Sequence, residues 1–490
     1  MSALIRLVFS KKGGEIMEKL IRSSGILMPM TALPSPYGIG TMGYTARNFL
    51  QFLHQSGQRW WQLLPIGHTG YGDSPYQAFS AFAGNPYWID LEALAADKLL
   101  TESDLQEARS NNTERIDYGW LAQTRIPLLR RAYLRIGAVE RTALQEFAAS
   151  EGAWVQEYAM FMAGKEQNAM RPWTVWQDWH KPSSMALEFY IWLQYRFFQQ
   201  WDALRDAAYV LGIRLLGDLP LYVAHDSADV LLHPAWFQLD AVAGVPPDTF
   251  AATGQRWGNP LYRWDVMAAE GYGWWRTRIR MAARLYDAVR IDHFRGLSSY
   301  WTIPAACETA ENGHWEAGPG EEFVRMIQEE VPHLQLIGED LGTMTPELPT
   351  FLQDCGLPGM RVLQFASAGM EGEMHFPQYA PEHSVYYIGT HDNATLREWL
   401  ETADPAVVSK IVTDPDTDPI EQIFRAVMQS PAALCILRIQ DLLGLGQEGR
   451  LNVPGTAAGN WQWKLHTLPS DEIADALRTW TVQSGRMCGK

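Results

Sequence analysis

Apolar residues gather along the chain in eight short runs that show little polar alternation. Strands buried on both faces of a parallel sheet have this pattern, because helices cover both faces. Amphipathic segments lie between the runs, and several of them end at a glycine just before the next run, as helices often do. The runs are residues 25–30, 60–66, 214–223, 288–294, 334–340, 360–366, 384–392 and 434–443.

Eight buried strands that alternate with helices predict an α/β protein built as a (β/α)8 barrel, or TIM barrel. The spacing of the runs is uneven, so we expect insertions. Residues 18–66 should start the barrel with strands 1 and 2, and residues 67–213 should form a large, mostly helical insertion. Strand 3 at 214–223 should be followed by a flap at 224–273, and residues 274–490 should supply strands 4 to 8.

Composition narrows the class of protein. The chain has 490 residues, 47% of them hydrophobic, and a formal net charge of −16. The negative charge argues against nucleic acid or an anionic membrane as a partner, and no apolar run reaches the ~18 residues of a membrane span. The four cysteines form no CxxC pair, which favours a reducing cytoplasm. Residues 1–16 show no packing pattern, so we expect Met17 to be the native start.

Two segments resemble nucleotide-binding or metal-binding motifs but lack residues that those motifs require. Residues 38–43 match GxGxxG, but no strand runs directly into them and the first acid downstream is Asp73, so a dinucleotide site is not expected. Residues 414–418 begin like a calcium loop, yet Pro419 and Arg425 occupy the positions of its glycine and its bidentate acid. No histidine has HExxH spacing, so a zinc site is not expected either.

Three carboxylates stand where apolar runs end and polar loops begin: Asp292, Glu339 and Asp392. The C-terminal ends of barrel strands carry the catalytic groups of such folds, and a carboxylate pair is what cleavage of a glycosidic bond requires. A single strand-end acid is often only a loop cap or an ion-pair partner. Three of them, accompanied by strand-end histidines, predict an active site for glycoside chemistry.

Local neighbours suggest how these acids divide the work. Arg290 precedes Asp292 by two residues, so on a strand both point the same way, and the guanidinium should lower the pKa of this carboxyl as a nucleophile needs. Glu339 lies in an apolar run beside Asp340, which should raise its pKa as an acid/base needs. Asp392 follows His391, and both are suited to hold sugar hydroxyls.

With these residues the chain closely resembles the 4-α-glucanotransferases, called amylomaltases or disproportionating enzymes, of glycoside hydrolase family 77. The shared motifs extend from about residue 25 to residue 463, which is nearly the whole chain. They are GYGDSPYQ at 70–77, FAGNP at 82–86, GDLP at 217–220, DSAD at 226–229, GQRWGNP at 254–260, RIDHFRG at 290–296, GEDLG at 338–342, GTHDN at 389–393, NVPGT at 452–456 and GNW at 459–461.

The resemblance implies roles for particular residues. It implies Asp292 as nucleophile, Glu339 as acid/base and Asp392 as stabiliser of the transition state. It also implies that substrate is bound without a metal or an organic cofactor. The expected substrate-binding residues are Tyr71, Ser74, Asp218, Asp248, Trp257, Asn259, Arg290, His293, His391, Asn452, Pro454 and Asn460.

The reaction that the resemblance implies is a transfer. A segment of an α-1,4-glucan moves through a covalent glucosyl-enzyme to the 4-hydroxyl of an acceptor, either a maltooligosaccharide or glucose, and cyclisation is a further outcome. Two alternatives stay open. A retaining α-amylase-type hydrolase would use the same acids, and a non-catalytic glucan-binding protein would keep the barrel but not the chemistry. The products formed from maltotriose separate all three.

Overall fold

The computed structural model of the protein describes residues 20–70, 72–111, 114–177, 180–247, 251–342, 347–367, 369–456 and 458–487. Two of the expected substrate-binding residues, Tyr71 and Asp248, lie outside these ranges. The segment before the expected start at Met17 lies outside them as well. No helix of the described part is long and apolar enough to cross a membrane.

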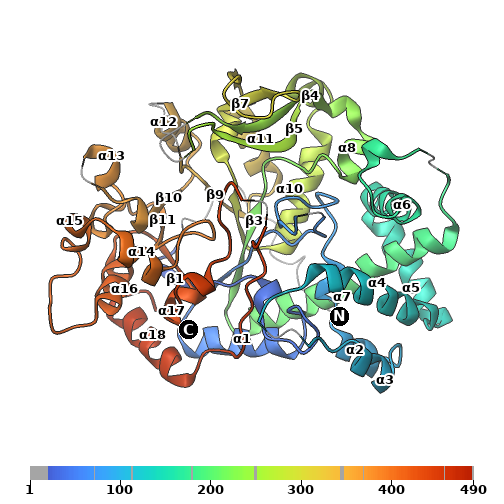
Figure 1. Ribbon diagram of the computed structural model, residues 1–490, viewed down its shortest axis with the longest axis horizontal. Helices are drawn as coiled ribbons and strands as arrows, with labels where there is room; N and C mark the ends of the chain where they lie inside the picture. Colours follow the sequence, from blue (N-terminus) through green and yellow to red (C-terminus); the bar gives the residue numbers. More distant parts are fainter. Residues whose placement is uncertain are drawn as a thin grey trace, which may run out of the picture.

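Eight parallel strands form the centre of the molecule (Figure 1). They follow one another around a barrel in chain order, and the last strand pairs with the first. At the one junction without a ladder, the Gly338 N–H donates to the carbonyl of Pro358 at 3.0 Å. The strands are β1 (Ser23–Leu27), β2 (Trp60–Gln62), β3 (Arg214–Leu219), β6 (Ala288–Ile291), β9 (Gln335–Gly338), β10 (Gly359–Val362), β11 (Ser384–Tyr387) and β12 (Leu434–Arg438).

The predicted barrel is confirmed, and each predicted run overlaps one of these strands. Strands such as β1, β11 and β12 are buried along their whole length, which explains why their sequences lack polar alternation. Several runs continue past the strand itself. β6 ends at Ile291, so Asp292 is the first residue of the loop that follows, at the catalytic end of the barrel.

Helices surround the strands. Gly57, Gly212 and Gly356 follow helices with φ of 74°, 72° and 67°, a left-handed conformation that glycine adopts easily. The helices outside the barrel are α1 (Tyr44–Gln55), α7 (Ser184–Val210), α10 (Gly273–Leu285), α11 (Gly320–Glu330), α12 (Glu347–Asp354), α14 (Leu396–Thr402), α16 (Pro419–Gln429) and α18 (Asp471–Gln483).

Between β2 and β3 the chain is mostly helical and lies to one side of the barrel, at the right of Figure 1. Helix α7 ends this segment and packs on α1 and α6, which ties the helices to the barrel wall. The helices before α7 are α2 (Leu91–Ala96), α3 (Glu102–Glu107), α4 (Tyr118–Leu134), α5 (Ala138–Glu151) and α6 (Ala153–Gln167).

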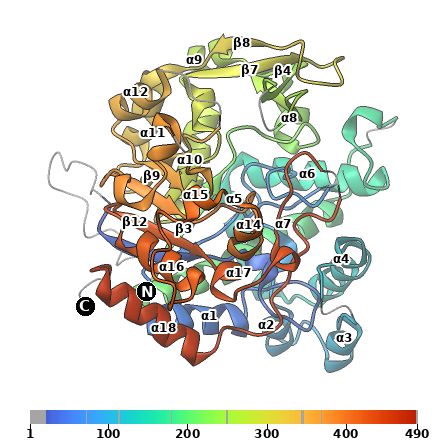
Figure 2. The same ribbon diagram turned by 60° about the vertical axis from the view of Figure 1, so that its left-hand side comes forward.

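A second sheet, antiparallel and in the order β5-β4-β7-β8, lies beyond the barrel at the top of Figures 1 and 2. Strands β4 (Phe237–Val245) and β5 (Gln255–Tyr262) come between β3 and β6. Strands β7 (Ser299–Pro304) and β8 (His314–Ala317) come after β6, so two separate loops build one sheet. The hydrophobic pattern did not predict β7 and β8. Strand β7 pairs with β4, which is distant in sequence, and β8 pairs only with β7 at the edge of the sheet.

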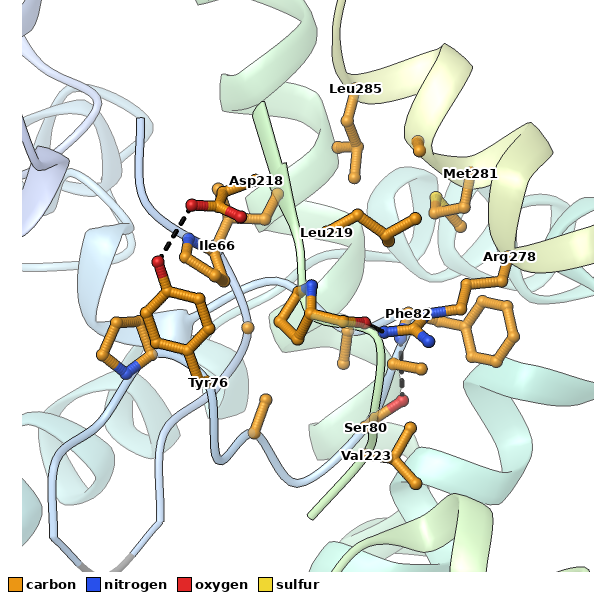
Figure 3. Close-up of a pocket in the computed structure, with 18 of the residues that line it drawn as sticks. Ile66, Tyr76, Ser80, Phe82, Asp218, Leu219, Val223, Arg278, Met281 and Leu285 are labelled. Carbon is orange, nitrogen blue, oxygen red and sulfur yellow. Dashed lines mark hydrogen bonds between the residues drawn. The ribbon is translucent and has the colours of Figure 1, made fainter. Parts of the chain in front are cut away.

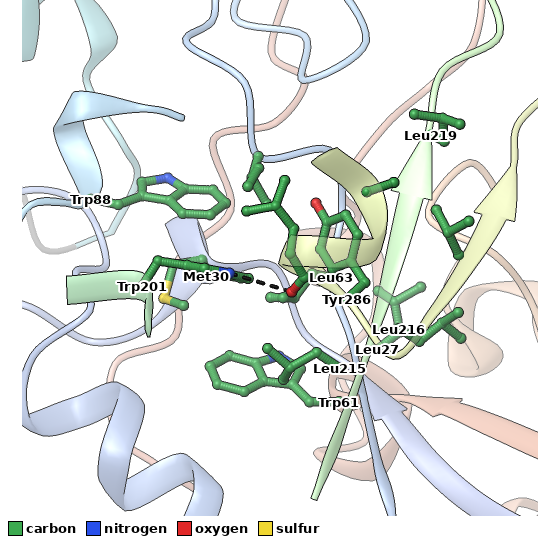
Figure 4. Close-up of a cluster of buried hydrophobic side chains, with 14 of the residues drawn as sticks. Leu27, Met30, Trp61, Leu63, Trp88, Trp201, Leu215, Leu216, Leu219 and Tyr286 are labelled. Carbon is green, nitrogen blue, oxygen red and sulfur yellow. Dashed lines mark hydrogen bonds between the residues drawn. The ribbon is translucent and has the colours of Figure 1, made fainter. Parts of the chain in front are cut away.

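Large aromatic residues fill the space between the helical segment and the barrel. Figure 4 shows Trp61, Trp88 and Trp201 gathered near Leu215 and Tyr286. The ring of Tyr286 lies under Gly217, where an added Cβ would stand 2.3 Å from the ring. Gly217 therefore permits close packing beneath β3, directly before Asp218.

The barrel end opposite the catalytic loops is closed by a buried arginine near the C-terminus. Arg486 is fully buried and donates to the carbonyls of Met428 at 2.6 Å, Ser23 at 3.0 Å and Ser430 at 2.9 Å. These carbonyls belong to the segments that lead into β1 and β12. The side chain thus joins the first strand, the last strand and the C-terminal segment.

We expect Arg486→Met to lower the free energy of unfolding by about 3 kcal/mol, because buried carbonyls would lose a charged donor. Urea denaturation followed by circular dichroism measures this. The matched control is Arg478→Met, the same change at an exposed site on α18, which should cost less than about 0.5 kcal/mol. Equal stability of both variants would contradict the role of Arg486.

Candidate active site

The side chain of Arg290 lies between three carboxylates at the catalytic end of the barrel. Its Nη1 lies 2.6 Å from both carboxylate oxygens of Asp218. Its Nη2 lies 2.9 Å from Oδ1 of Asp292 and 3.3 Å from Oε2 of Glu339. Arg290 is buried and the carboxylate of Asp218 is fully enclosed. The structure therefore brings four of the predicted residues together around one cation.

The register of the parallel strands explains this meeting. Asp218 of β3 stands opposite Arg290 of β6, so both side chains point to the same side of the sheet. Asp292 lies two residues after Arg290 and points the same way. The ladder between β6 and β9 pairs Ile291 with Gly338, and its next step places Asp292 beside Glu339. Three neighbouring strands thus contribute at two successive levels, Asp218 with Arg290 and then Asp292 with Glu339.

Glu339 is further fixed by the backbone. The N–H of His293 donates to its Oε2 at 2.6 Å. His293 adopts a left-handed conformation with φ of 48°, so the chain turns sharply after Asp292. The ring of His293 meets Trp257 edge to face, with 4.8 Å between ring centroids. Trp257 thereby brings β5 of the second sheet beside the catalytic turn.

The pKa values of the two central acids differ in part from the sequence prediction. Burial raises the pKa of Glu339, as expected. Burial also raises the pKa of Asp292 well above its ordinary value, although Arg290 acts in the opposite direction. The prediction that Arg290 keeps this pKa low was wrong, because one guanidinium is shared among three carboxylates in a buried place.

Asp392 forms the other side of the site. Its Oδ1 accepts a hydrogen bond from Nδ2 of Asn452 at 2.6 Å, and its Oδ2 lies 3.4 Å from Nε2 of His391. The side chain is 43% exposed, so it faces the open cleft. Burial lowers the pKa of His391, which keeps the imidazole neutral and able to hydrogen-bond a hydroxyl.

Tyr76 is a site residue that the sequence reasoning missed. Its hydroxyl donates to Oδ2 of Asp218 at 2.9 Å (Figure 3). The same hydroxyl lies 2.9 Å from Nε2 of His391. The ring stacks on His391 at 5.2 Å. Burial raises the pKa of Tyr76 well above its ordinary value, so it stays a donor. The sequence signal for Tyr76 is its place in the GYGDSPYQ motif, in which the family resemblance indicates Tyr71 and Ser74 instead.

The remaining predicted residues have mainly supporting contacts. The hydroxyl of Ser74 accepts from the Tyr76 N–H at 3.3 Å. The Asn259 amide accepts from Gln77 at 2.9 Å and donates to the Val223 carbonyl at 2.8 Å, which joins β5 to the loop around Tyr76. The side chain of Asn460 bonds to the backbone of its own loop. Pro454 is exposed in that loop and makes none of the polar contacts described above.

Trp461 lies beside this group in an unusual conformation. Its φ is 64°, a left-handed value that costs a bulky residue about 1–3 kcal/mol. Its N–H donates to the Leu451 carbonyl at 2.7 Å, and its own carbonyl accepts from the Tyr118 hydroxyl at 3.1 Å. The indole lies 5.9 Å from the Tyr76 ring and 5.8 Å from the His391 ring. The surrounding bonds hold the strained backbone in place.

Two cavities adjoin the site. The first runs from Tyr76 and Asp218 along Leu219 to Arg278 and Met281 of α10 (Figure 3). Most of the residues that line it are apolar, and Asp218 and Arg278 are its charged members. Within the residues that the structure describes, no group of three or more His, Cys, Asp or Glu side chains is arranged to hold a metal ion.

The second cavity lies beneath the loop that carries Ser74 and Tyr76. It is lined by Thr69, Asp73, Trp88, Tyr118 and Trp461, among others. The indole N–H of Trp88 and the hydroxyl of Thr69 are buried there without a hydrogen-bond partner. Burial, together with the charge of Asp117, raises the pKa of Asp73 to about 6.

A (β/α)8 barrel with paired carboxylates under a buried arginine defines an enzyme that acts on glycosidic bonds. A family model described as 4-alpha-glucanotransferase, of glycoside hydrolase family 77, matches residues 28–470. The 4-alpha-glucanotransferase of Thermus thermophilus is 44% identical over 481 residues, which cover 91% of this chain and 95% of the relative. That of Synechocystis sp. is 39% identical over 485 residues, covering 93% and 95%.

A solved structure agrees with these sequence relatives. The amylomaltase from Streptococcus agalactiae in complex with acarbose matches with a TM-score of 0.90 and 34% identity, covering 95% of this chain and 99% of that one. The amylomaltase from Corynebacterium glutamicum, at 21% identity and a TM-score of 0.79, shares the fold. The chain belongs to the 4-α-glucanotransferase family, and it is an enzyme.

The raised pKa of Asp73 predicts a pH-dependent stability. An acid whose pKa is higher in the folded than in the unfolded state makes the protein less stable as the pH rises from 3.8 to about 6. We therefore expect Asp73→Asn to raise the melting temperature at pH 7.5, by about 1–3 °C, and to leave it unchanged near pH 4. Differential scanning calorimetry at both pH values measures this.

The matched control is Asp475→Asn, the same change at an exposed position on α18, which should give no pH-dependent difference. If Asp73→Asn shifts the melting temperature equally at both pH values, the carboxyl charge is not the cause.

Proposed function

We propose that the enzyme transfers α-1,4-glucan segments by a retaining mechanism, with a covalent glucosyl-enzyme on Asp292. The observation that carries this proposal is the contact of one nitrogen, Nη2 of Arg290, with both central acids. This nitrogen lies 2.9 Å from Oδ1 of Asp292 and 3.3 Å from Oε2 of Glu339, so these two oxygens cannot be more than about 6.2 Å apart. Retaining pairs stand ~5–5.5 Å apart, whereas inverting pairs need ~6.5–9.5 Å to admit a water.

Asp292 is the better nucleophile of the pair. It lies closer to the Arg290 nitrogen than Glu339 does, at 2.9 Å against 3.3 Å, and its side chain is more open to the cleft, 27% exposed against 17%. Both features suit Asp292 to attack C1 from the cleft. Burial raises the pKa of both acids, which favours retention of one proton by the pair, and we assign this proton to Glu339.

The reaction then follows in two steps. Glu339 gives its proton to the glycosidic oxygen, the C1–O bond breaks, and the Asp292 carboxylate bonds to C1. The leaving glucan departs with a free 4-hydroxyl. In the second step an acceptor 4-hydroxyl attacks C1, Glu339 takes its proton, and the ester to Asp292 breaks. When the acceptor is the far end of the same chain, the product is a ring.

Other residues of the site stabilise the transition state. Asp392 is fixed by Asn452 and flanked by neutral His391, so this group is suited to bind hydroxyls of a distorted sugar ring. Interactions that strengthen as the ring flattens lower the barrier rather than merely binding substrate. Asp218 does not face the sugar. Its carboxylate is fully enclosed, and its role is to hold Arg290 and the Tyr76 hydroxyl.

Transfer requires that an acceptor sugar outcompetes water. Positioning provides effective molarities of ~10⁵ M or more, which exceeds the ~55 M concentration of water. The parts suited to hold an acceptor and cover the cleft are the loop around Tyr76 and the strand β5 that carries Trp257. The similarity of the chain to a 4-alpha-glucanotransferase and to an amylomaltase favours transfer over the hydrolase alternative.

We expect Asp292→Asn to reduce turnover at least about 10⁴-fold, because an amide is a poor nucleophile. Glu339→Gln should trap the intermediate when given an activated glucosyl donor whose leaving group needs no proton. Mass spectrometry of a digest should then find the sugar on Asp292. The controls are Asp240→Asn and Glu329→Gln, the same changes at exposed positions, which should keep full turnover. An adduct on another residue would overturn the assignment.

Incubation with maltotriose tests the proposed reaction as a whole. We expect glucose and a ladder of longer maltooligosaccharides on chromatography, with almost no net rise in reducing ends, because each bond broken is replaced by a new one. Amylose should lose its iodine colour faster when glucose is added as acceptor. A rise in reducing ends that keeps pace with the loss of substrate would indicate a hydrolase, and unchanged maltotriose would indicate a binding protein.

A further inference from the structure

We infer that Trp461 is a positioning residue of the active site, whose indole fixes the rings of Tyr76 and His391 without touching the reacting atoms. This inference rests on the proposed function and adds a residue to it. The three rings form a cluster in which every pair is in contact, with centroid separations of 5.2 Å for Tyr76 and His391, 5.9 Å for Tyr76 and Trp461, and 5.8 Å for His391 and Trp461.

The backbone of Trp461 is the first observation. A left-handed conformation is rare in bulky residues and is retained where the surrounding structure enforces it, often at functional sites. Gly459, two residues earlier, has φ of 81°, so the chain turns tightly just before Trp461. This turn places the indole against two residues that come from the loop after β11 and from the loop after β2.

The second observation is that the position of Trp461 is fixed from outside the active site. The chain that follows it is bonded to distant segments. The Ile116 N–H donates to the Gln462 carbonyl at 2.8 Å, and the Leu465 N–H donates to the Ala32 carbonyl at 2.8 Å. Lys464 donates through Nζ to the Ser35 carbonyl at 2.8 Å. Trp461 is therefore anchored to the helical segment and to the loop after β1.

The third observation is what the ring supports. Tyr76 donates to Asp218, the carboxylate that holds Arg290, and His391 lies beside Asp392. Behind the indole is the second cavity, lined by Asp73, Trp88 and Tyr118, so no packed side chains would replace the ring if it were removed. Tyr76 and His391 would then be free to tilt, and Asp218 and Asp392 would lose fixed partners.

The chain offers a matched control. Tyr272, at the start of α10, is also a bulky aromatic residue in the left-handed region, with φ of 56°. Its ring packs edge to face on Phe323, outside the barrel. Glycine accepts this backbone conformation without strain, so Trp461→Gly and Tyr272→Gly both relieve the backbone and delete a ring. They differ in whether the deleted ring touches the cluster.

The experiment measures kcat and KM for maltotriose in the full-length chain, corrected for the folded fraction at each temperature. We expect Trp461→Gly to lower kcat at least about 10-fold with KM within about threefold, because the lost contacts act on the transition state. Tyr272→Gly should leave both constants within about twofold. Trp461→Phe, which keeps a ring against Tyr76 and His391, should recover kcat to within about threefold of the parent.

A fall in melting temperature with unchanged kcat per folded molecule in Trp461→Gly would overturn the inference, since the indole would then be core packing only. If Trp461→Gly does not fold, the variants to compare are Trp461→Asn and Tyr272→Asn. Asparagine is one of the non-glycine residues that tolerate the left-handed region best. A parent chain that releases no glucose from maltotriose refutes the proposed function. An active parent with an equally active Trp461 variant refutes this inference alone.

Discussion

The active site depends on a shortage of positive charge around Arg290. Three carboxylates lie within 3.3 Å of a single guanidinium in a buried place. One cation cannot neutralise three anions where solvent screening is weak, so the pKa of Asp292 and that of Glu339 both rise. A bond-breaking acid needs such a retained proton near neutral pH. The excess of carboxylates that makes this region costly to fold is thus what equips it for catalysis.

A second buried arginine fixes the other half of the site. Arg438, at the end of β12, donates to the carbonyls of Thr390 at 2.8 Å and Asn393 at 3.0 Å, and it pairs with Asp441 at 2.8 Å. These bonds satisfy the backbone of the loop that carries Asp392. Here the cation has one carboxylate partner, fully enclosed, so its charge is balanced. The difference in charge balance distinguishes Arg438, with one carboxylate partner, from Arg290, with three, on the same barrel.

The sequence predicted those parts of the fold and site that depend on local patterns. The eight strands, the glycines that end helices and the position of Arg290 beside Asp292 follow from spacings of a few residues. What it did not predict depends on register between distant segments. The contact of Arg290 with Asp218 joins positions 72 residues apart, and the second sheet joins β4 to β7 across the whole of β6.

Two further features that the sequence did not predict, the pKa of Asp292 and the backbone conformation of Trp461, have different physical causes. The pKa of Asp292 depends on burial and on how many acids share Arg290, and neither quantity is visible in the residues next to it. The left-handed conformation of Trp461 contradicts the preference of a bulky residue, so no local rule points to it. Predictions from local sequence preference fail where the surrounding structure enforces another conformation, and such positions are common at functional sites.

The packing of the core beneath β3 also affects the strength of the Asp218–Arg290 ion pair. The side chain of Asp218 is fully enclosed, and the chain beneath β3 packs closely at Gly217. Gly217 has no side chain, and the Tyr286 ring fills that position so closely that a Cβ would stand 2.3 Å away. Burial of this ring keeps the dielectric low under the Asp218–Arg290 pair and strengthens it. A glycine in β3 and a tyrosine before β6 therefore belong to the electrostatics of the site as much as the acids do.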